Sequence, residues 1–215
     1  METVSFSLLE LFKLGGTAMW PLAAFSVATL AIGFERIFYL SYHNLRMNVL
    51  EKTVSDYITN RDYNGAADFL APLTKRAMGA RILLALVKRA TPGKPFSERN
   101  VERAVETEAM VCINSLESGF NFLVALGSLS PLTGFLGTVS GMIGAFRSIA
   151  EATEVNAQIV ANGIYEALIT TVFGLIIAIV AMVFHSVFTH IVDKFSAEVE
   201  KSCSDLIAEI AGQQQ

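Results

Sequence analysis

The sequence predicts an all-α membrane protein with three transmembrane helices and long cytoplasmic helical extensions. Of its 215 residues, 53% are hydrophobic and only 17% are charged, whereas about a quarter of a soluble domain is charged. The apolar residues concentrate in three runs, at 14–34, 118–146 and 155–192. Each run exceeds the roughly 20 residues that a helix needs to cross about 30 Å of hydrocarbon. A soluble bundle with long buried helices is the weaker alternative.

The first transmembrane helix is predicted at residues 14–41. The preceding residues 1–13 contain several apolar side chains, which fit a short helix at the outer membrane interface better than a span. They lack a basic region and a small-residue cleavage site, so we expect no secretory signal peptide.

Residues 42–112 are predicted to form a helical cytoplasmic insert, because their apolar residues recur at helical spacing between turn signals. The expected helices cover residues 45–60, 61–70 (with a candidate break at Asn64–Gly65) and 74–90, the last ended by a turn at 91–95.

The second span is predicted at 113–147. Ser97 is a candidate N-cap, and no Gly or Pro occurs between it and Gly119. We therefore expect one uninterrupted helix over 97–148, on the order of 75 Å long. An outer loop at 148–158, a third span at 159–190 and a cytoplasmic C-terminal helix at 191–215 complete the predicted order.

Basic residues beside the spans predict the orientation, because cytoplasmic flanks carry an excess of Lys and Arg. One side has Arg36, Arg46, Lys52, Arg99, Arg103 and Lys194, and the other has Lys13 and Arg147. The N-terminus is therefore expected outside and the C-terminus in the cytoplasm. Cys112 and Cys203 then face the reducing side, where a disulfide is not expected, and their spacing suggests no metal site.

Small residues recur every three or four positions along the second and third spans. The second has Gly127, Ser130, Gly134, Gly137, Thr138, Gly141 and Ala145, and the third has Gly163, Ala167, Thr170, Thr171, Gly174, Ala178 and Ala181. Such faces let helix backbones approach closely, and Gly137-x-x-x-Gly141 is a packing motif. Two interpretations remain: simple helix–helix packing, or a lining for a tube that another helix occupies.

Three polar side chains lie at related depths. If residues 133 and 175 mark the middles of the two spans, Thr138 and Thr171 lie roughly 7 and 6 Å outward, and Glu166 roughly 13 Å outward. An ionisable residue inside a membrane predicts a functional site. We expect all three side chains to border one wet axis. The alternative for Glu166 is contact with outer headgroups or a neighbouring helix.

The sequence predicts no enzyme. Ser140 and His185 could suggest a serine protease dyad, but their depths separate them by about 25 Å along the helices, whereas a nucleophile and its base need about 3 Å. No P-loop, dinucleotide-binding or Cys/His metal motif occurs, so we expect no cofactor. His185 and His190 are interpreted as boundary residues at the inner interface.

Three segments resemble the MotA/TolQ/ExbB proton channel family. Residues 15–40, GGTAMWPLAAFSVATLAIGFERIFYL, resemble the first span of ExbB-type proteins. Residues 128–146, SLSPLTGFLGTVSGMIGAF, resemble the second-span signature, with its proline and Leu-Gly-Thr-Val. Residues 163–175, GIYEALITTVFGL, resemble the third-span signature. The three-span order favours the ExbB/TolQ branch over MotA.

The resemblance implies a subunit of an ion-driven, energy-transducing complex in the bacterial inner membrane. It implies a homopentameric ring whose second and third spans enclose a pore. Inside it would lie two helices of an ExbD-, TolR- or MotB-type partner with one span each, whose aspartate carries the ion. Proton is the implied ion, and sodium is the alternative. Lipid and these proteins are the expected partners, and no nucleic acid is expected.

The resemblance maps the threonines that face the partner's aspartate onto Thr138 and Thr171, and the pore glutamate onto Glu166. The other residues predicted to line the pore are Thr170, Ser130, Gly134 and Gly141. Those predicted to pack helices are Gly137, Gly174 and Pro131, and those predicted to fix orientation include Arg36 and Lys52.

The residues themselves support the need for a partner, since no predicted span contains an aspartate. A proton route through a membrane usually needs titrating groups along it. Two rival interpretations remain: a non-conducting membrane scaffold of the same fold, and a small-solute channel formed by this chain alone.

Overall fold

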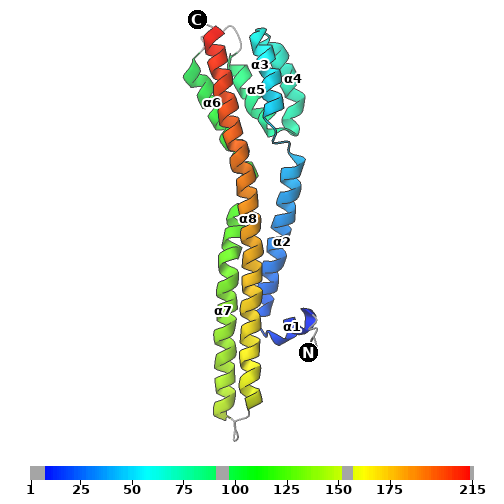
Figure 1. Cartoon of the computed structure of the whole chain (residues 1–215), viewed down its shortest axis with the longest axis vertical. Coiled ribbons are helices and arrows are strands. Elements are labelled where there is room, and N and C mark those ends of the chain that lie inside the picture. The colour runs from blue at the N-terminus through cyan, green and yellow to red at the C-terminus, as the bar shows by residue number, and fades with distance from the viewer. Residues whose placement is uncertain (1–7, 91–96, 152–156, 214–215) are drawn as a thin grey trace, which may run out of the picture. The chain divides into compact units, whose positions relative to one another are not determined.

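The computed structural model describes residues 8–90, 97–151 and 157–213. The regular secondary structure of these residues is helical, apart from one isolated bridge between Asn44 and Ala77, which confirms the predicted all-α class. The helices are α1 (Leu8–Leu14), α2 (Met19–Tyr42), α3 (Asn48–Thr59), α4 (Tyr63–Leu70), the 3-10 helix η1 (Ala71–Lys75), α5 (Met78–Ala90), α6 (Glu98–Glu117), α7 (Phe120–Glu151) and α8 (Ala157–Gln213) (Figure 1).

Three helical stretches in the described residues are long and apolar enough to cross a membrane. They are Met19–Tyr42, Glu98–Glu151 and Ala161–Gln213. The chain divides into two compact units, each described by itself. The first comprises Met1–Phe34 with Gly119–Ser186, and the second comprises Glu35–Ser118 with Val187–Gln215.

In the first unit, α1 lies across the beginning of α2 instead of continuing it (Figure 1). α2 begins at Met19, whereas the span was predicted from residue 14. The difference arises at Gly16, whose φ of 64° is a left-handed conformation that glycine adopts without steric cost. The predicted interfacial helix corresponds to α1, and residues 1–7 lie outside the described residues.

The prediction of one continuous helix over 97–148 is wrong. α6 ends at Glu117 and α7 begins at Phe120. Gly119, between them, has a φ of 88°, and such a left-handed glycine commonly ends a helix. At its other end α7 extends to Glu151, into the predicted outer loop, of which residues 152–156 lie outside the described residues.

In the second unit, the predicted break at Asn64–Gly65 is wrong, because α4 runs through both residues. The break lies just before α4, at Arg61, whose φ is 56°. Asp62 then caps α4: its Oδ1 accepts a hydrogen bond of 2.9 Å from the Gly65 backbone N–H. The predicted turn at 91–95 lies outside the described residues.

The C-terminal part of α8 is hydrogen-bonded to α3 within the second unit. Glu209 accepts bonds from the hydroxyls of Ser55 (2.8 Å) and Thr59 (2.7 Å), and Ser202 donates to Glu51 (2.6 Å). Two buried residues of α8, Leu206 and Ile210, accompany these bonds; burying side chains of this kind contributes roughly 1.5–3 kcal/mol each. The tail is therefore part of a core and not a solvated extension.

Cys203 lies in this core, with 3% of its surface exposed. Burial, together with the nearby Glu51 carboxylate, raises the pKa of the Cys203 thiol to about 12. A thiol with a raised pKa stays protonated in the folded state. The stability it contributes is complete below the ordinary thiol pKa of about 8.5 and is lost as the pH rises from there towards 12.

We therefore expect Cys203 to resist alkylation in the folded protein. In a Cys112→Ala variant, N-ethylmaleimide at about pH 8 should modify Cys203 at least about tenfold more slowly than after unfolding, because the thiolate is the nucleophile. A matched control moves the thiol to the neighbouring exposed Ser204 (Cys112→Ala, Cys203→Ala, Ser204→Cys). Equal rates for Cys203 and the control would contradict the burial of this thiol. Mass spectrometry measures both.

Candidate functional site

The candidate site is built on the contact between α7 and the first part of α8, which run antiparallel in the first unit (Figure 1). A Cβ added at Gly174 would lie 2.5 Å from the Ser130 carbonyl oxygen and 3.3 Å from the Gly134 Cα. A Cβ at Gly134 would lie 2.7 Å from the Thr170 carbonyl oxygen. The two backbones therefore approach so closely that only glycine fits at these positions.

The register of this contact agrees with the depths expected from the sequence. Gly134 lies opposite Gly174, close to the expected pairing of residues 133 and 175. Further along, a Cβ at Gly141 would lie 3.3 Å from the Gly163 carbonyl oxygen. Gly137 and Gly174, predicted as packing residues, both lie in this contact, and Pro131 lies within α7.

Four residues predicted to line a pore lie in the same contact. Ser130 and Thr170 are 0% and 1% exposed, and Gly134 is also buried. The Thr170 hydroxyl donates to the Ala167 carbonyl (2.8 Å) and the Gly134 carbonyl (3.1 Å). Within one chain these groups are occupied by packing, whereas Gly141 also lines an open groove, and the pore-lining role of all four residues stays a prediction.

Thr138 and Thr171 lie beside this contact and are half-buried. The Thr138 hydroxyl donates to the Phe135 carbonyl (2.6 Å), and the Thr171 hydroxyl donates to the Gly134 carbonyl (3.4 Å). Gly137, one residue before Thr138, neighbours Ala18 of the turn before α2. Because Thr138 is about 100° further round α7, it points away from that turn.

Glu166 lies on the other side of α8. Five residues separate it from Thr171, which places the two side chains about 140° apart around the helix. Ala167 and Thr170, which face α7, lie between these two directions. The Glu166 carboxylate is beside Gly16, in the turn before α2. The structure thus places Glu166 and the threonine pair on different sides of α8 within one chain, and the prediction that all three border one axis stays a prediction.

An open groove of about 430 Å³ between the ends of α7 and α8 contains Glu166. Its polar lining also includes Ser140, Ser148 and Asn162, which sequence reasoning did not assign to the site. A helical spacing of eight residues between the serines, and of four between Asn162 and Glu166, was the signal that could have found them. The groove can hold water or a small cation beside a carboxylate.

The described residues do not support a catalytic dyad. Ser140 lies in the groove with Glu166, whereas His185 packs against Phe120 with ring centroids 6.2 Å apart. Since 19 residues separate Glu166 from His185 on α8, His185 is roughly 28 Å along the helix from the groove. His190 lies in the second unit and is exposed.

The two residues predicted to fix the orientation differ in their surroundings within the second unit. The Arg36 guanidinium donates to the Ser115 carbonyl (3.2 Å), pairs with Glu35 and lies 4.8 Å from the centre of the Tyr39 ring. Lys52 is exposed on α3. Arg36 therefore also joins α2 to α6, which charge counting could not reveal.

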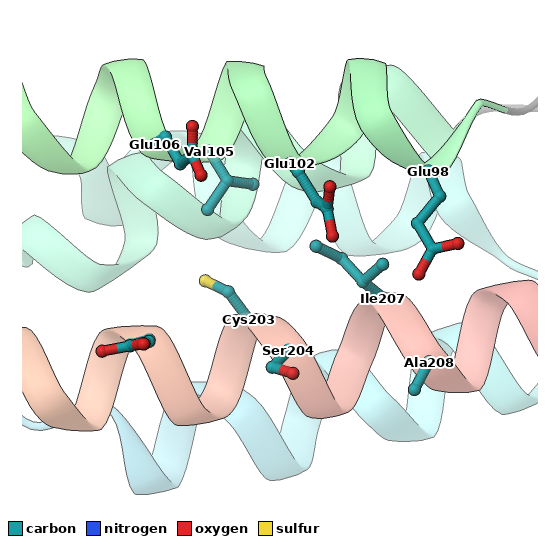
Figure 2. A pocket seen from close by; sticks show the side chains of 9 residues that line it. Glu98, Glu102, Val105, Glu106, Cys203, Ser204, Ile207 and Ala208 are labelled. Carbon is teal, nitrogen blue, oxygen red and sulfur yellow. The ribbon is translucent and has the colours of Figure 1, made fainter.

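A second groove, of about 240 Å³, lies between α6 and α8 in the second unit. Figure 2 shows Glu98, Glu102 and Glu106 of α6 above Cys203 and Ile207 of α8. Within the described residues, no group of three or more His, Cys, Asp or Glu side chains has the arrangement of a metal site. The cysteines of this part of the chain are free.

These features define a helical multi-pass membrane protein whose second and third spans pack through glycines and present a pair of threonines. More particularly, the chain belongs to the MotA/TolQ/ExbB proton channel family: the family's profile matches residues 74–201, which include α5, α6, α7 and most of α8.

Relatives support this assignment. The chain is 33% identical over 188 residues to a biopolymer transport protein named ExbB-like 1 of Synechocystis sp., covering 81% of this chain and 68% of the relative. It is 28% identical to the biopolymer transport protein ExbB of Salmonella typhimurium, covering 80% and 71%. It is 43% identical over 97 residues to the Tol-Pal system protein TolQ of Haemophilus influenzae, covering 45% and 42%.

The α7–α8 contact predicts the effect of adding a methyl group. Gly174→Ala should destabilise the protein by roughly 1–3 kcal/mol, because the new Cβ meets backbone atoms that cannot move away. Gly144→Ala is the matched control: a Cβ there meets nothing within 4 Å, and alanine favours the helix by up to about 1 kcal/mol. Thermal unfolding in detergent, followed by circular dichroism, compares them. Equal stability of the two variants would contradict this packing.

Proposed function

We propose that this chain is the multi-pass inner-membrane subunit of a proton-driven, energy-transducing complex. Membership of the proton channel family supports the broad function, and names such as ExbB and TolQ among its relatives support the branch. The observation that carries the mechanism is the threonine pair, Thr138 and Thr171. It lies on one side of a helix pair whose spans contain no aspartate.

The missing carboxylate is the reason to propose a partner. An ion route across a membrane needs titrating or coordinating groups near its middle. Here the threonines supply hydroxyls but no charge. We propose that five copies of the chain form a ring and that an ExbD- or TolR-type partner, in two copies, supplies single-span helices with an aspartate. The side of α7 and α8 that bears Thr138 and Thr171 would then face the partner.

The threonines and Glu166 are proposed to act at different places. Thr138 and Thr171 would hydrate or coordinate the ion at the partner's aspartate, because hydroxyls can both donate and accept hydrogen bonds. Glu166, in the groove near the ends of α7 and α8, would attract cations at the outer entrance. Proton is the proposed ion, and no cofactor or catalytic activity is needed for this role.

The proposed orientation places the N-terminus and the groove outside and the second unit in the cytoplasm. The excess of basic residues around the second unit, Arg36 and Lys52 among them, supports it. In this arrangement α3 to α6 and the end of α8 form the cytoplasmic part of the subunit, and the outward position of Glu166 follows from its place on α8.

The first test concerns the threonine pair. With the partner co-expressed, Thr171→Ala should lower gradient-driven proton flux into proteoliposomes by about tenfold or more, since one oriented hydroxyl beside a charge contributes roughly 1.5–3 kcal/mol. Thr171→Ser keeps the hydroxyl and should retain most of the flux. Thr170→Ser is the control at a packed position, where the hydroxyl bonds the backbone. Unchanged flux in Thr171→Ala and Glu166→Gln together would remove the conduction role.

The second test separates this function from its rivals. The purified chain alone should give no proton or small-solute flux in liposomes, and flux should appear only when the partner is reconstituted with it. Flux from the chain alone would favour a stand-alone channel. If the complex assembles, as measured by native mass spectrometry, but conducts nothing under a proton gradient, the non-conducting scaffold is favoured.

A further inference from the structure

The turn that joins α1 to α2 meets α7 and α8 beside the glutamate. A Cβ added at Gly15 would lie 3.3 Å from Ile169 Cγ2, and one at Gly137 would lie 3.0 Å from the Ala18 Cβ. Between these contacts, Gly16 lies against the Glu166 carboxylate. Gly15, Gly16 and Ala18 of the turn therefore lie close to the helix pair, with the glutamate beside Gly16.

The turn is held in place by packing on both sides. After it, Met19 and Leu22 form a buried cluster with Ile169 and Ile177 of α8. Before it, Leu11 and Phe12 of α1 pack against the same cluster. Because apolar contacts fix the chain on either side, the position of Gly16 relative to α8 is set by the core of the first unit and not by the carboxylate.

Gly16 has two independent reasons to be a glycine. Its φ of 64° lies in the left-handed region, which most residues adopt only at a cost. A Cβ there would also lie 2.9 Å from the Glu166 Cδ and would overlap the carboxylate oxygen Oε1. The first reason concerns the turn alone, whereas the second concerns the glutamate.

The other side of the carboxylate faces the groove lined by Ser140, Ser148 and Asn162. Glu166 forms no ion pair with another described residue, so no basic side chain holds it there. The backbone of the turn is the surface that limits its movement away from the groove. Without a side chain at Gly16, the carboxylate has room beside the turn and remains half-buried.

We propose that Gly16 is a positioning residue for Glu166: the turn between α1 and α2 covers the carboxylate and holds it at the groove between α7 and α8. The importance of this for ion flux rests on the proposed function. The positioning itself does not, because it concerns where the carboxylate lies.

The experiment measures the carboxylate directly. A water-soluble carbodiimide with an added amine, which couples the amine to carboxyl groups that water reaches, is applied to the purified complex, and peptide mass spectrometry gives the rate at Glu166. Gly16→Ala should raise this rate by at least about threefold, because the new Cβ displaces the carboxylate from its cover. Gly16→Asn should do the same with less backbone strain, since asparagine tolerates left-handed φ. Gly144→Ala, in the same groove but with open space around it, should react like the wild type.

A double variant separates the contact between Gly16 and Glu166 from backbone strain in the turn. If Gly16→Ala fails to fold, Gly16→Ala combined with Glu166→Ala should recover a monodisperse complex, because the collision is gone. If this double variant also fails to fold, strain at the left-handed φ is the cause, and Gly16→Asn then carries the test of the proposal. A wild-type labelling rate in folded Gly16→Ala and Gly16→Asn would overturn it.

Measuring proton flux together with labelling tests the positioning of Glu166 separately from the proposed role of Glu166 in conduction. If Gly16→Ala alters both labelling and flux, and Gly144→Ala alters neither, positioning and ion route are both supported. If labelling changes while Glu166→Gln conducts normally, Gly16 positions the carboxylate but the carboxylate has no part in conduction. That result would overturn the proposed role of Glu166 and leave the positioning intact.

Discussion

The first unit depends on the contact of two backbones, α7 and α8, at Gly134 and Gly174. An added Cβ at either glycine would meet backbone atoms within 2.7 Å, so the helices are as close as their main chains allow. Apolar side chains bring no hydrophobic advantage between helices that are already in lipid, and close packing with hydrogen bonds such as that from Thr170 to the Gly134 carbonyl takes its place. This contact fixes the register of every polar group on the two spans.

Fixing the register also divides the helix pair into two sides with different chemistry. Thr138 and Thr171 occupy one side and offer hydroxyls without charge. Glu166 occupies the other, with the serines and asparagine of the groove around it. A subunit built this way can present a neutral polar surface to a partner helix while a carboxylate is kept apart, near the ends of the helices. The turn at Gly16 gives the carboxylate side its cover, because Met19 and Leu22 anchor the turn to α8.

The second unit packs like an ordinary water-soluble domain. Its helices are amphipathic, its core is aliphatic, and hydroxyl–carboxylate bonds such as Ser202 to Glu51 join α8 to α3. α8 is thus one continuous helix. Its first part packs as helices do within lipid, and its last part packs as helices do in a water-soluble domain. The acidic groove beside α6 is a solvated feature of this unit (Figure 2).

The sequence by itself determined the helical class, the three spans, the family motifs and the small-residue stripes, because hydropathy and spacing act locally along the chain. It could not locate the break at Gly119 or the turn at Gly16, since a glycine permits a left-handed conformation without requiring one. Nor could it decide which small residues pack and which remain accessible: Thr170 and Thr171 are adjacent and equally polar. Only the tertiary structure decided that Thr170 is buried against Gly134 and that Glu166 faces away from the threonines. The contacts between α7 and α8, which join residues far apart in the chain, select the inward direction.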